Sequence, residues 1–421
     1  MIIHQPEILK QDNHTIVWAK IELETRPKNF PDYLWYRLPD KYDDYICTNS
    51  DAFLVPGLVA GMHFGEDIQV RGTVSPRLAY HLDEIQFLLN FWMPNEVCQV
   101  SIHYEHLEPA QVQPQAVGCT FSGGVDSWFT LWNHLPQNQP IQEFRLTHAL
   151  FINLFDITSR NTSKYLRLGE HYRSELQKLG IELITLETNL VSLLIPRLRL
   201  LAFFSPVLAG CALLMQGLFK RFYIASGGDY YKLTRRLSSS NPLTERLSST
   251  DTLEFIHFGS VYSRHKKIEI LSDWQLAQQN LRVCGRPDLS EQLLNCSRCE
   301  KCMRTMFPIY ALGKMDQFTT FAKLFTTNKD TLMWARKFNP DQSALPGLFQ
   351  FIKNQKPDLL PWLRCIVLLG SLRYRFLKRI PESAKIFLQR FGYYHDLLKV
   401  ENAFEKPEII QVIRARDRTT S

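Results

Sequence analysis

The feature that most constrains the fold is an alternation of short apolar runs with helical patterns between residues 116 and 314. Five runs have the length and composition of buried strands: residues 116–121, 149–155, 181–186, 222–226 and 253–258. Between the second and third runs, residues 164–179 place apolar side chains at helical spacing, and Gly180 follows where a helix C-cap belongs. Strand, helix and strand in this order form a βαβ unit. The pattern therefore predicts an α/β fold with a parallel sheet.

One segment of this region is long and apolar enough to cross a bilayer. Residues 200–219 contain no charged side chain. However, Pro206 and Gly210 interrupt the segment, and it stands between two strands of one predicted sheet. We therefore expect a helix buried inside the α/β domain, apolar on all sides, and no membrane partner.

The two flanking regions have different patterns, and we expect three domains in all, at residues 1–113, 114–314 and 315–421. The first region predicts an α+β domain that binds substrate or a partner, with strands at 15–24, 33–38, 67–74 and 99–104 and a helix at 79–91. The last region predicts a helical domain, with helices at 359–372 and 385–400 and frayed residues from 415. Its basic cluster is interpreted as a solvated helix face: Arg373, Arg375, Lys378 and Arg379.

The loop after the first parallel strand carries the strongest functional signal. It consists of Phe121, Ser122, Gly123, Gly124, Val125, Asp126 and Ser127. The glycines let the backbone approach a ligand, and the amides at the start of the following helix favour an anion such as phosphate. A carboxylate among these groups indicates that a cation also binds, and Mg²⁺ on phosphate oxygens meets that requirement. The chain contains neither a Walker A nor a Rossmann glycine motif.

Ser-Gly-Gly-Val-Asp-Ser resembles the S-G-G-x-D-S signature of PP-loop ATP pyrophosphatases. The resemblance implies a sheet of the adenine-nucleotide-hydrolase type. It also implies that residues 121–127 bind ATP and that ATP is cleaved between its α- and β-phosphates. Asp126 would help to place Mg²⁺.

Four of the nine cysteines form a pattern typical of metal sites. Cys296, Cys299 and Cys302 follow one another as C-x₂-C-x₂-C, and Cys284 precedes them in the chain. Four thiolates are the full ligand set of a structural zinc site, and an iron–sulfur cluster is the alternative that the same ligands allow. Clustered cysteines without a secretory signal indicate a reducing compartment, so we expect a cytoplasmic protein.

The order of loop, sheet and four cysteines resembles the 7-cyano-7-deazaguanine synthase (QueC) family over residues 116–305. The resemblance implies an ATP-dependent C–N ligase that adenylates 7-carboxy-7-deazaguanine and forms an amide or nitrile with ammonia, with Zn²⁺ held by the four cysteines. Related PP-loop proteins place a basic residue near positions 263–267, where it reaches the phosphates. Lys267 and Arg264 are therefore expected to act with Asp126 in catalysis. For Arg264 and Lys267, the alternative is a basic helix start that faces water. Asp229 follows the fourth strand, and it either contacts a metal ion or a ribose or belongs to an ordinary turn.

Long flanking regions suggest a reactant larger than ammonia, such as an amine on a partner protein. Extended QueC-like proteins of this kind resemble components of bacterial antiviral defence. A second hypothesis is a tRNA-modifying PP-loop enzyme, for which the net charge of +7 is favourable but no RNA-binding motif is recognisable. A third is a nucleotide-binding protein without activity. The sequence does not determine the oligomeric state.

Overall fold

The computed structural model describes residues 1–25, 27, 30–154, 162–193, 200–233, 240–285, 294–322, 334–335, 345–379 and 406–420. They form an α/β protein with a large, mixed and mostly parallel sheet. The chain divides into two compact units. The first comprises Met1–Ser122, Thr130–Val261 and Val400–Ser421, and the second comprises Gly123–Phe129 and Tyr262–Lys399. The three domains expected from the sequence stay a prediction.

Five strands that are consecutive in the chain form one parallel part of the sheet, in the first unit. They are β7 (Ala116–Thr120), β8 (His148–Ile152), β9 (Glu182–Thr188), β10 (Phe219–Ala225) and β11 (Glu254–Phe258). Each was predicted from the sequence with small shifts at its ends, and residue 155 lies outside the described residues. Their order is β11-β10-β7-β8-β9, so the direction of winding reverses at β7. Ligands of α/β proteins bind at the carboxyl ends of the strands at such a switch point.

The N-terminal strands extend the same sheet. They are β1 (Ile2–Ile3), β2 (Glu7–Gln11), β3 (His14–Glu22), β4 (Tyr33–Pro39), β5 (Ile68–Val74) and β6 (Ile102–Leu107). The junction is an antiparallel pairing in which Tyr36 of β4 lies opposite Thr188 of β9. Asn189 fastens this junction, because its buried side chain accepts a hydrogen bond from Trp35 N and donates one to Tyr33 O. The strands of residues 1–113 and the strands β7 to β11 therefore belong to one sheet.

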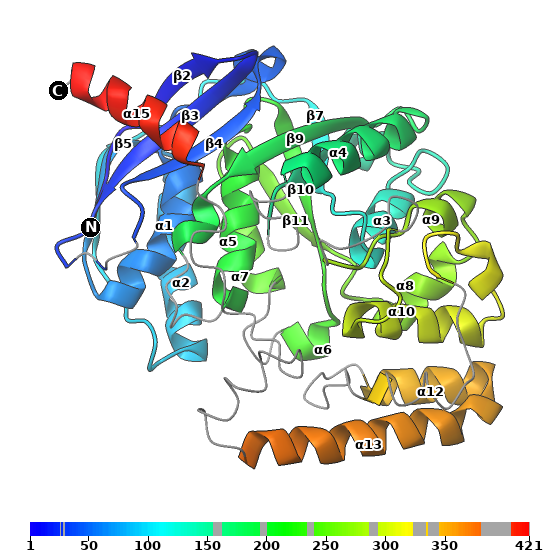
Figure 1. Cartoon of the computed structure of the whole chain (residues 1–421). Helices are drawn as coiled ribbons and strands as arrows, with labels where there is room; N and C mark the ends of the chain where they lie inside the picture. Colours follow the sequence, from blue (N-terminus) through cyan, green and yellow to red (C-terminus); the bar gives the residue numbers. More distant parts are fainter. Residues whose placement is uncertain are drawn as a thin grey trace. The chain divides into compact units, whose positions relative to one another are not determined.

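The helices of the first unit include α1 (Asp51–Phe64), α2 (Pro76–Trp92), α4 (Thr162–Gln177), α5 (Leu200–Leu213), α6 (Tyr230–Leu233) and α7 (Pro242–Leu247). α1 packs against α5, and α2 packs against α7 (Figure 1). The approach is close at Gly210 of α5, where a Cβ atom would lie 2.7 Å from the carbonyl oxygen of Ala52. Within the apolar segment 200–219, Leu200–Leu213 form α5 and Phe219 begins β10, and the side chains from Phe204 onward are mostly buried. Among the described residues, no helix is long and apolar enough to cross a membrane.

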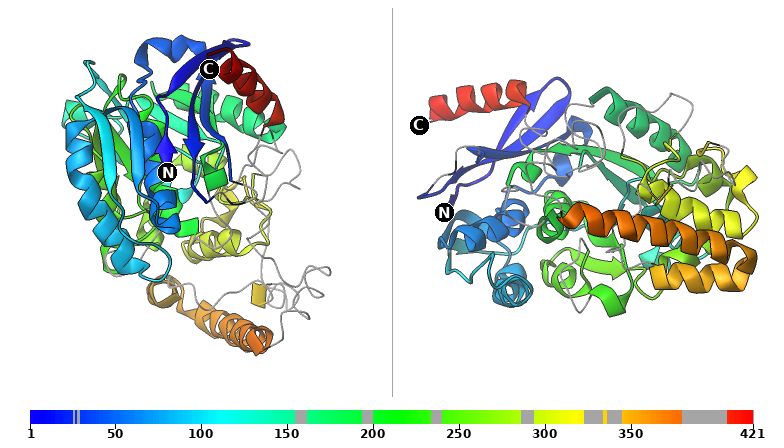
Figure 2. Two further views of the ribbon diagram at one scale, coloured as in Figure 1. Left: turned by 90° about the vertical axis from the view of Figure 1, so that its left-hand side faces the viewer. Right: turned by 60° about the horizontal axis from the view of Figure 1, so that its bottom comes forward.

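The C-terminal helix α15 (Pro407–Thr420) lies beside β2, β3 and β4 (Figure 2). Ile409 and Ile413 form a small core with Trp18 and Trp35, and all four side chains are buried. Tyr33 Oη also donates a hydrogen bond to Asp417 at 2.9 Å. The expectation of frayed residues from 415 is wrong, because these contacts hold the last turns of α15 as a helix.

The second unit is helical apart from its loop residues. It contains α8 (Arg264–Leu271), α9 (Gln275–Asn280), α10 (Glu300–Ala311), α12 (Leu345–Gln355) and α13 (Leu360–Arg379). α10 packs against α8 and α12, and Phe307 of α10 contacts Trp334 and Trp362 at ring-centroid distances of 4.6 and 5.2 Å. The helix predicted at 359–372 is confirmed as α13, whereas the one predicted at 385–400 lies outside the described residues.

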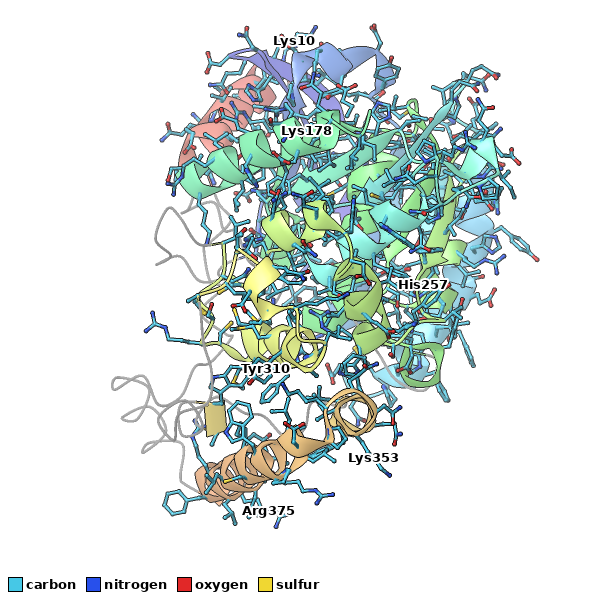
Figure 3. The ribbon with its side chains drawn as sticks, turned by 90° about the vertical axis from the view of Figure 1, so that its right-hand side faces the viewer. Lys10, Lys178, His257, Tyr310, Lys353 and Arg375 are labelled. Atoms are coloured by element: carbon cyan, nitrogen blue, oxygen red, sulfur yellow. The ribbon has the colours of Figure 1, made fainter. Side chains whose placement is uncertain are left out.

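Short 3₁₀ helices complete the described elements: η1 (Asp40–Tyr45), η2 (Gln142–Phe144), η4 (Leu190–Leu193), η5 (Met315–Gln317) and η6 (Pro357–Leu359). In the basic segment of α13, Arg375 is exposed, as expected for a solvated helix face; Figure 3 labels it together with Lys353 of α12. The side chains of Lys378 and Arg379 lie outside the described residues.

Candidate functional site

The predicted phosphate loop connects β7 to helix α3 (Val125–Asn133). Gly123 has a φ of 75°, a left-handed conformation that glycine adopts without strain, and the chain then enters the helix at Val125. Trp128 N donates to the carbonyl of Gly124 at 3.0 Å, which closes the first helical turn. The segment therefore has the strand, glycine turn and helix start predicted from the sequence.

The predicted loop residues differ in what their side chains can do. Phe121 is buried and packs edge-on against Tyr172, and Val125 is buried as well, so these two contribute to packing. Ser127 is buried and its Oγ donates to Gly124 O at 3.1 Å. Ser122 is exposed at the carboxyl end of β7. Any contact of Phe121 and Val125 with a nucleotide would have to come from their backbone atoms.

Asp126 pairs with both of the predicted catalytic cations. Arg264 Nη1 lies 2.9 Å from Asp126 Oδ2, and Lys267 Nζ lies 2.9 Å from Asp126 Oδ1. The Lys267 side chain is only 2% exposed, and its Nζ lies 5.7 Å from the centroid of the Phe129 ring. The structure thus brings Asp126, Arg264 and Lys267 into one cluster within the second unit.

The basic residues of the segment 263–267 begin helix α8. Ser263 is the N-cap of α8, and its Oγ accepts a hydrogen bond from Lys266 N at 3.2 Å, so the basic residues form the first turn. Arg264 and Lys267 are three positions apart and face Asp126, whereas Lys266 is half exposed and pairs with Glu269. Cations near a helix N-terminus oppose the helix dipole. Their presence therefore indicates a requirement for positive charge at this place.

The charge balance of the cluster is positive. Burial opposes the ionisation of Asp126, but the positive charges of Lys267 and Arg264 outweigh it and lower the pKa of the carboxyl group. Arg304 of α10 acts in the same direction, and burial lowers its own pKa. Arg304 also pairs with Glu300 at 2.7 Å, so three cations and two carboxylates leave a net positive charge, which suits a polyanion such as a phosphate chain.

Sequence reasoning missed two residues of this site. Arg282 N donates to the carbonyl of Gly123 at 2.7 Å, which ties a distant segment to the glycine turn. Thr305 is buried, and its Oγ1 accepts from Arg264 Nη2 at 3.5 Å. No local motif marks either residue. The only available signal was their proximity in the chain to Cys284 and Cys302.

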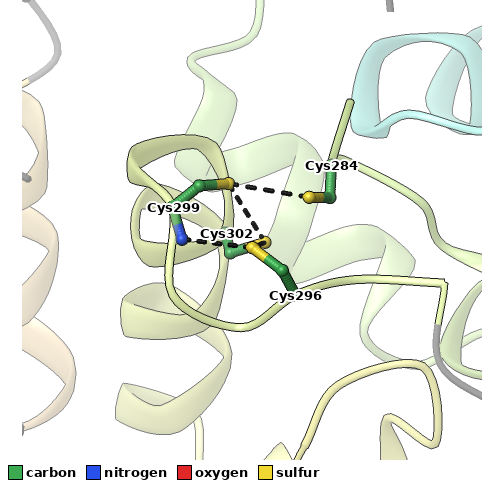
Figure 4. Close-up of side chains that lie close together, drawn as sticks. All are labelled: Cys284, Cys296, Cys299 and Cys302. Carbon is green, nitrogen blue, oxygen red and sulfur yellow. Dashed lines mark hydrogen bonds between the residues drawn. The ribbon is translucent and has the colours of Figure 1, made fainter. Parts of the chain in front are cut away.

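The four predicted metal ligands converge in the second unit (Figure 4). Their Sγ atoms all lie within 4.8 Å of one another, with the separations Cys296–Cys302 and Cys284–Cys299 at 3.8 Å and Cys299–Cys302 at 3.4 Å. Four sulfurs bound to one zinc ion at about 2.3 Å form a tetrahedron with edges of about 3.8 Å. The cluster is therefore compatible with a single zinc ion, and Cys284 is a full member of it.

Local structure prepares these thiols to bind a cation. Cys299 is the N-cap of α10 and Cys302 lies in its first turn, where the helix dipole favours thiolates. Cys299 N donates to Cys296 Sγ at 3.3 Å, a hydrogen bond that stabilises a thiolate at this position. The alternative of a multi-iron cluster fits less well, because iron and sulfide atoms would have to occupy the space between sulfurs that are already at contact distance.

Other residues considered in the sequence lie elsewhere. Asp229 precedes α6 in the first unit, and its carbonyl accepts a hydrogen bond from Leu233 N. Cys119 is a buried residue of β7, and burial raises its pKa to about 12, so it is an inert core thiol.

Comparisons with protein-family models, curated proteins and solved structures found no match to this chain.

Proposed function

We propose that this protein is an ATP pyrophosphatase of the PP-loop type that activates a carboxylate as an acyl adenylate. The observation that carries the proposal is the double pairing of Asp126 with Arg264 and Lys267 at the start of the helix that follows the glycine turn. This arrangement combines backbone amides and cations for a phosphate chain with a carboxylate for its metal ion.

The chemistry assigned to these side chains follows from their charges. A carboxylate oxygen attacks the α-phosphorus of ATP, the bond between the α-phosphorus and its bridging oxygen breaks, and pyrophosphate leaves. Negative charge develops on the phosphate oxygens during this step, and Lys267 and Arg264 stabilise it. Mg²⁺ bound with ATP would neutralise part of the same charge, and Asp126 is the carboxylate that would hold it. Asp126 also keeps the two cations oriented before the nucleotide binds.

The proposed substrate is a small deazapurine-like carboxylate, 7-carboxy-7-deazaguanine, and the acceptor is ammonia or an amine on a partner protein. An uncharged amine attacks the carbonyl carbon of the adenylate, AMP leaves, and the amine proton passes to water. This assignment is supported by the order of the loop and the four cysteines along the chain and by their occurrence in one compact unit. A role in antiviral defence belongs to the same proposal.

The test is product analysis by mass spectrometry. The full chain is incubated with ATP, Mg²⁺, ammonium and 7-carboxy-7-deazaguanine, and Lys267→Met is compared with the matched control Lys266→Met. We expect AMP, pyrophosphate and an amide or nitrile from the wild type and from Lys266→Met, and a loss of at least tenfold in Lys267→Met.

The outcomes separate the alternatives. AMP without a released base product, together with a mass increase on a candidate acceptor protein, assigns the acceptor to that protein. No AMP with this carboxylate, but AMP with tRNA, would favour the tRNA-modifying enzyme, whose binding would fall steeply with salt. Equal activities of Lys267→Met and Lys266→Met would contradict the role of the cluster.

A further inference from the structure

The segment that bears Cys284 also touches the phosphate loop. Arg282, two residues before this cysteine, donates its backbone N–H to Gly123 O at 2.7 Å. Arg282 and Cys284 are both buried, and Gly123 is the residue with the left-handed conformation. The position of the glycine turn is therefore tied by one short connection to a metal ligand.

Asn295 joins this segment to the remaining cysteines. It directly precedes Cys296 and is fully buried. Its Oδ1 accepts a hydrogen bond from Val283 N at 2.7 Å, and its Nδ2 donates one to Leu281 O at 2.7 Å. Its Nδ2 also donates to Thr320 O at 3.3 Å, and these buried hydrogen bonds hold residues 281–283 in place. The segment that bears Cys284 is therefore held by Asn295, the residue next to Cys296.

A second connection runs through α10. Cys299 and Cys302 hold the first turn of this helix, and Thr305 lies one turn further along. Thr305 Oγ1 accepts from Arg264 Nη2 and donates to Lys301 O at 3.0 Å. Arg264 in turn pairs with Asp126. The metal site is therefore connected both to the glycine turn and to the cation cluster.

We infer that the four-cysteine metal site positions the phosphate loop, so that the affinity for nucleotide depends on the metal. Asn295 is the positioning residue that transmits this dependence. The inference rests on the proposed function for the identity of the ligand, but the coupling itself concerns only the chain. Linkage requires the converse as well: a nucleotide that binds the ordered loop must raise the affinity of the four cysteines for the metal by the same factor.

Hydrogen exchange of the full chain tests the coupling without a ligand. Amide exchange is measured by mass spectrometry before and after removal of the metal with a chelator. We expect faster exchange in the loop peptide 121–128 when the metal is removed, and unchanged exchange in the helix α12. Asn295→Ala is expected to keep one metal ion per chain and still to show faster loop exchange, whereas Gln278→Ala, a matched amide whose Nε2 bonds Ser272 O and Gln317, is expected to behave as the wild type.

Binding of ATP with Mg²⁺, measured by calorimetry on the same samples, tests the consequence. We expect affinity to fall at least tenfold on metal removal and several-fold in metal-loaded Asn295→Ala. Loop exchange that does not change with metal removal or in Asn295→Ala would overturn the inference. If metal removal unfolds the second unit, metal-loaded Asn295→Ala decides alone. Wild-type protein that shows the exchange coupling but binds no ATP would overturn the proposed function and leave the coupling intact.

Discussion

Lys267→Met removes a buried ammonium group and keeps an unbranched side chain of similar length. Asp126 then loses its partner on Oδ1 and keeps Arg264 on Oδ2. Breaking a fully buried ion pair costs about 3–5 kcal/mol, and a hydrogen bond to a charged group contributes about 1.5–3 kcal/mol. Arg264 still compensates the carboxylate, and the Asp126 side chain is 22% exposed. We therefore expect a loss in the second of these ranges, about 2 kcal/mol in the free energy of unfolding.

A double-mutant cycle isolates this interaction. Urea unfolding of the wild type, Lys267→Met, Asp126→Asn and the double variant is followed by tryptophan fluorescence, to which Trp128 and Trp274 contribute from the second unit at a centroid distance of 5.4 Å. The double variant leaves no unpaired buried charge on either residue. We therefore expect the loss in the double variant to be smaller than the sum of the two single losses, by about 1.5–3 kcal/mol.

The control for this cycle is Lys266→Met, which changes a half-exposed lysine in the same helical turn and should alter stability by less than about 0.5 kcal/mol. Additive effects of the two substitutions, or a cost of Lys267→Met no larger than that of Lys266→Met, would refute the assignment of Asp126 and Lys267 as a buried pair.

Three further predictions follow from the same contacts. The pKa of Asp126 is lower in the folded than in the unfolded protein, so its ionisation stabilises the fold above the unfolded pKa of about 4. This stabilisation is lost as the pH falls through the folded-state pKa. In acid titrations followed by circular dichroism, the wild type should therefore lose more stability than Asp126→Asn. Elemental analysis should find one zinc ion per chain, with little in Cys302→Ser and an unchanged amount in Cys365→Ser, whose cysteine is exposed outside the cluster; equal contents would contradict the site. Ile413→Ala should lower the free energy of unfolding by about 2–5 kcal/mol, because Ile413 is buried where α15 packs against Trp18 and Trp35. Gln411→Ala on the exposed side of α15 should stay within about 0.5 kcal/mol, and equal effects would contradict the docking of α15.

The strands β7 to β11 and the candidate site residues could be predicted because their signals are local. An apolar run, a glycine turn and a helical stripe are adjacent in the chain, as at β7 and α3. The cysteine spacing likewise predicted the cluster of Cys296, Cys299 and Cys302, and Cys284 was added because it is near them in the sequence. Arg264 and Lys267 were assigned by resemblance, and their common partner Asp126 became visible only in three dimensions.

Three parts of the fold could not be predicted, for physical reasons. Helix α1 contains Pro56, Gly57 and Gly61 and is buried on nearly all sides, so it has neither an amphipathic pattern nor a favourable composition. The pairing of Tyr36 with Thr188 joins segments far apart in the chain, and strand periodicity contains no information about the partner strand. The docking of α15 on Trp18 and Trp35 is equally non-local.

The central claim is that the protein transfers the adenylyl group of ATP to a carboxylate. The most direct measurement uses 7-carboxy-7-deazaguanine labelled with oxygen-18 in its carboxyl group, with ATP, Mg²⁺ and ammonium, and determines the mass of the AMP formed. In the proposed reaction the amine attacks the carbonyl carbon, so AMP leaves with one labelled oxygen, and we predict AMP heavier by that one atom. Unlabelled AMP, or ADP and phosphate in its place, would contradict the account.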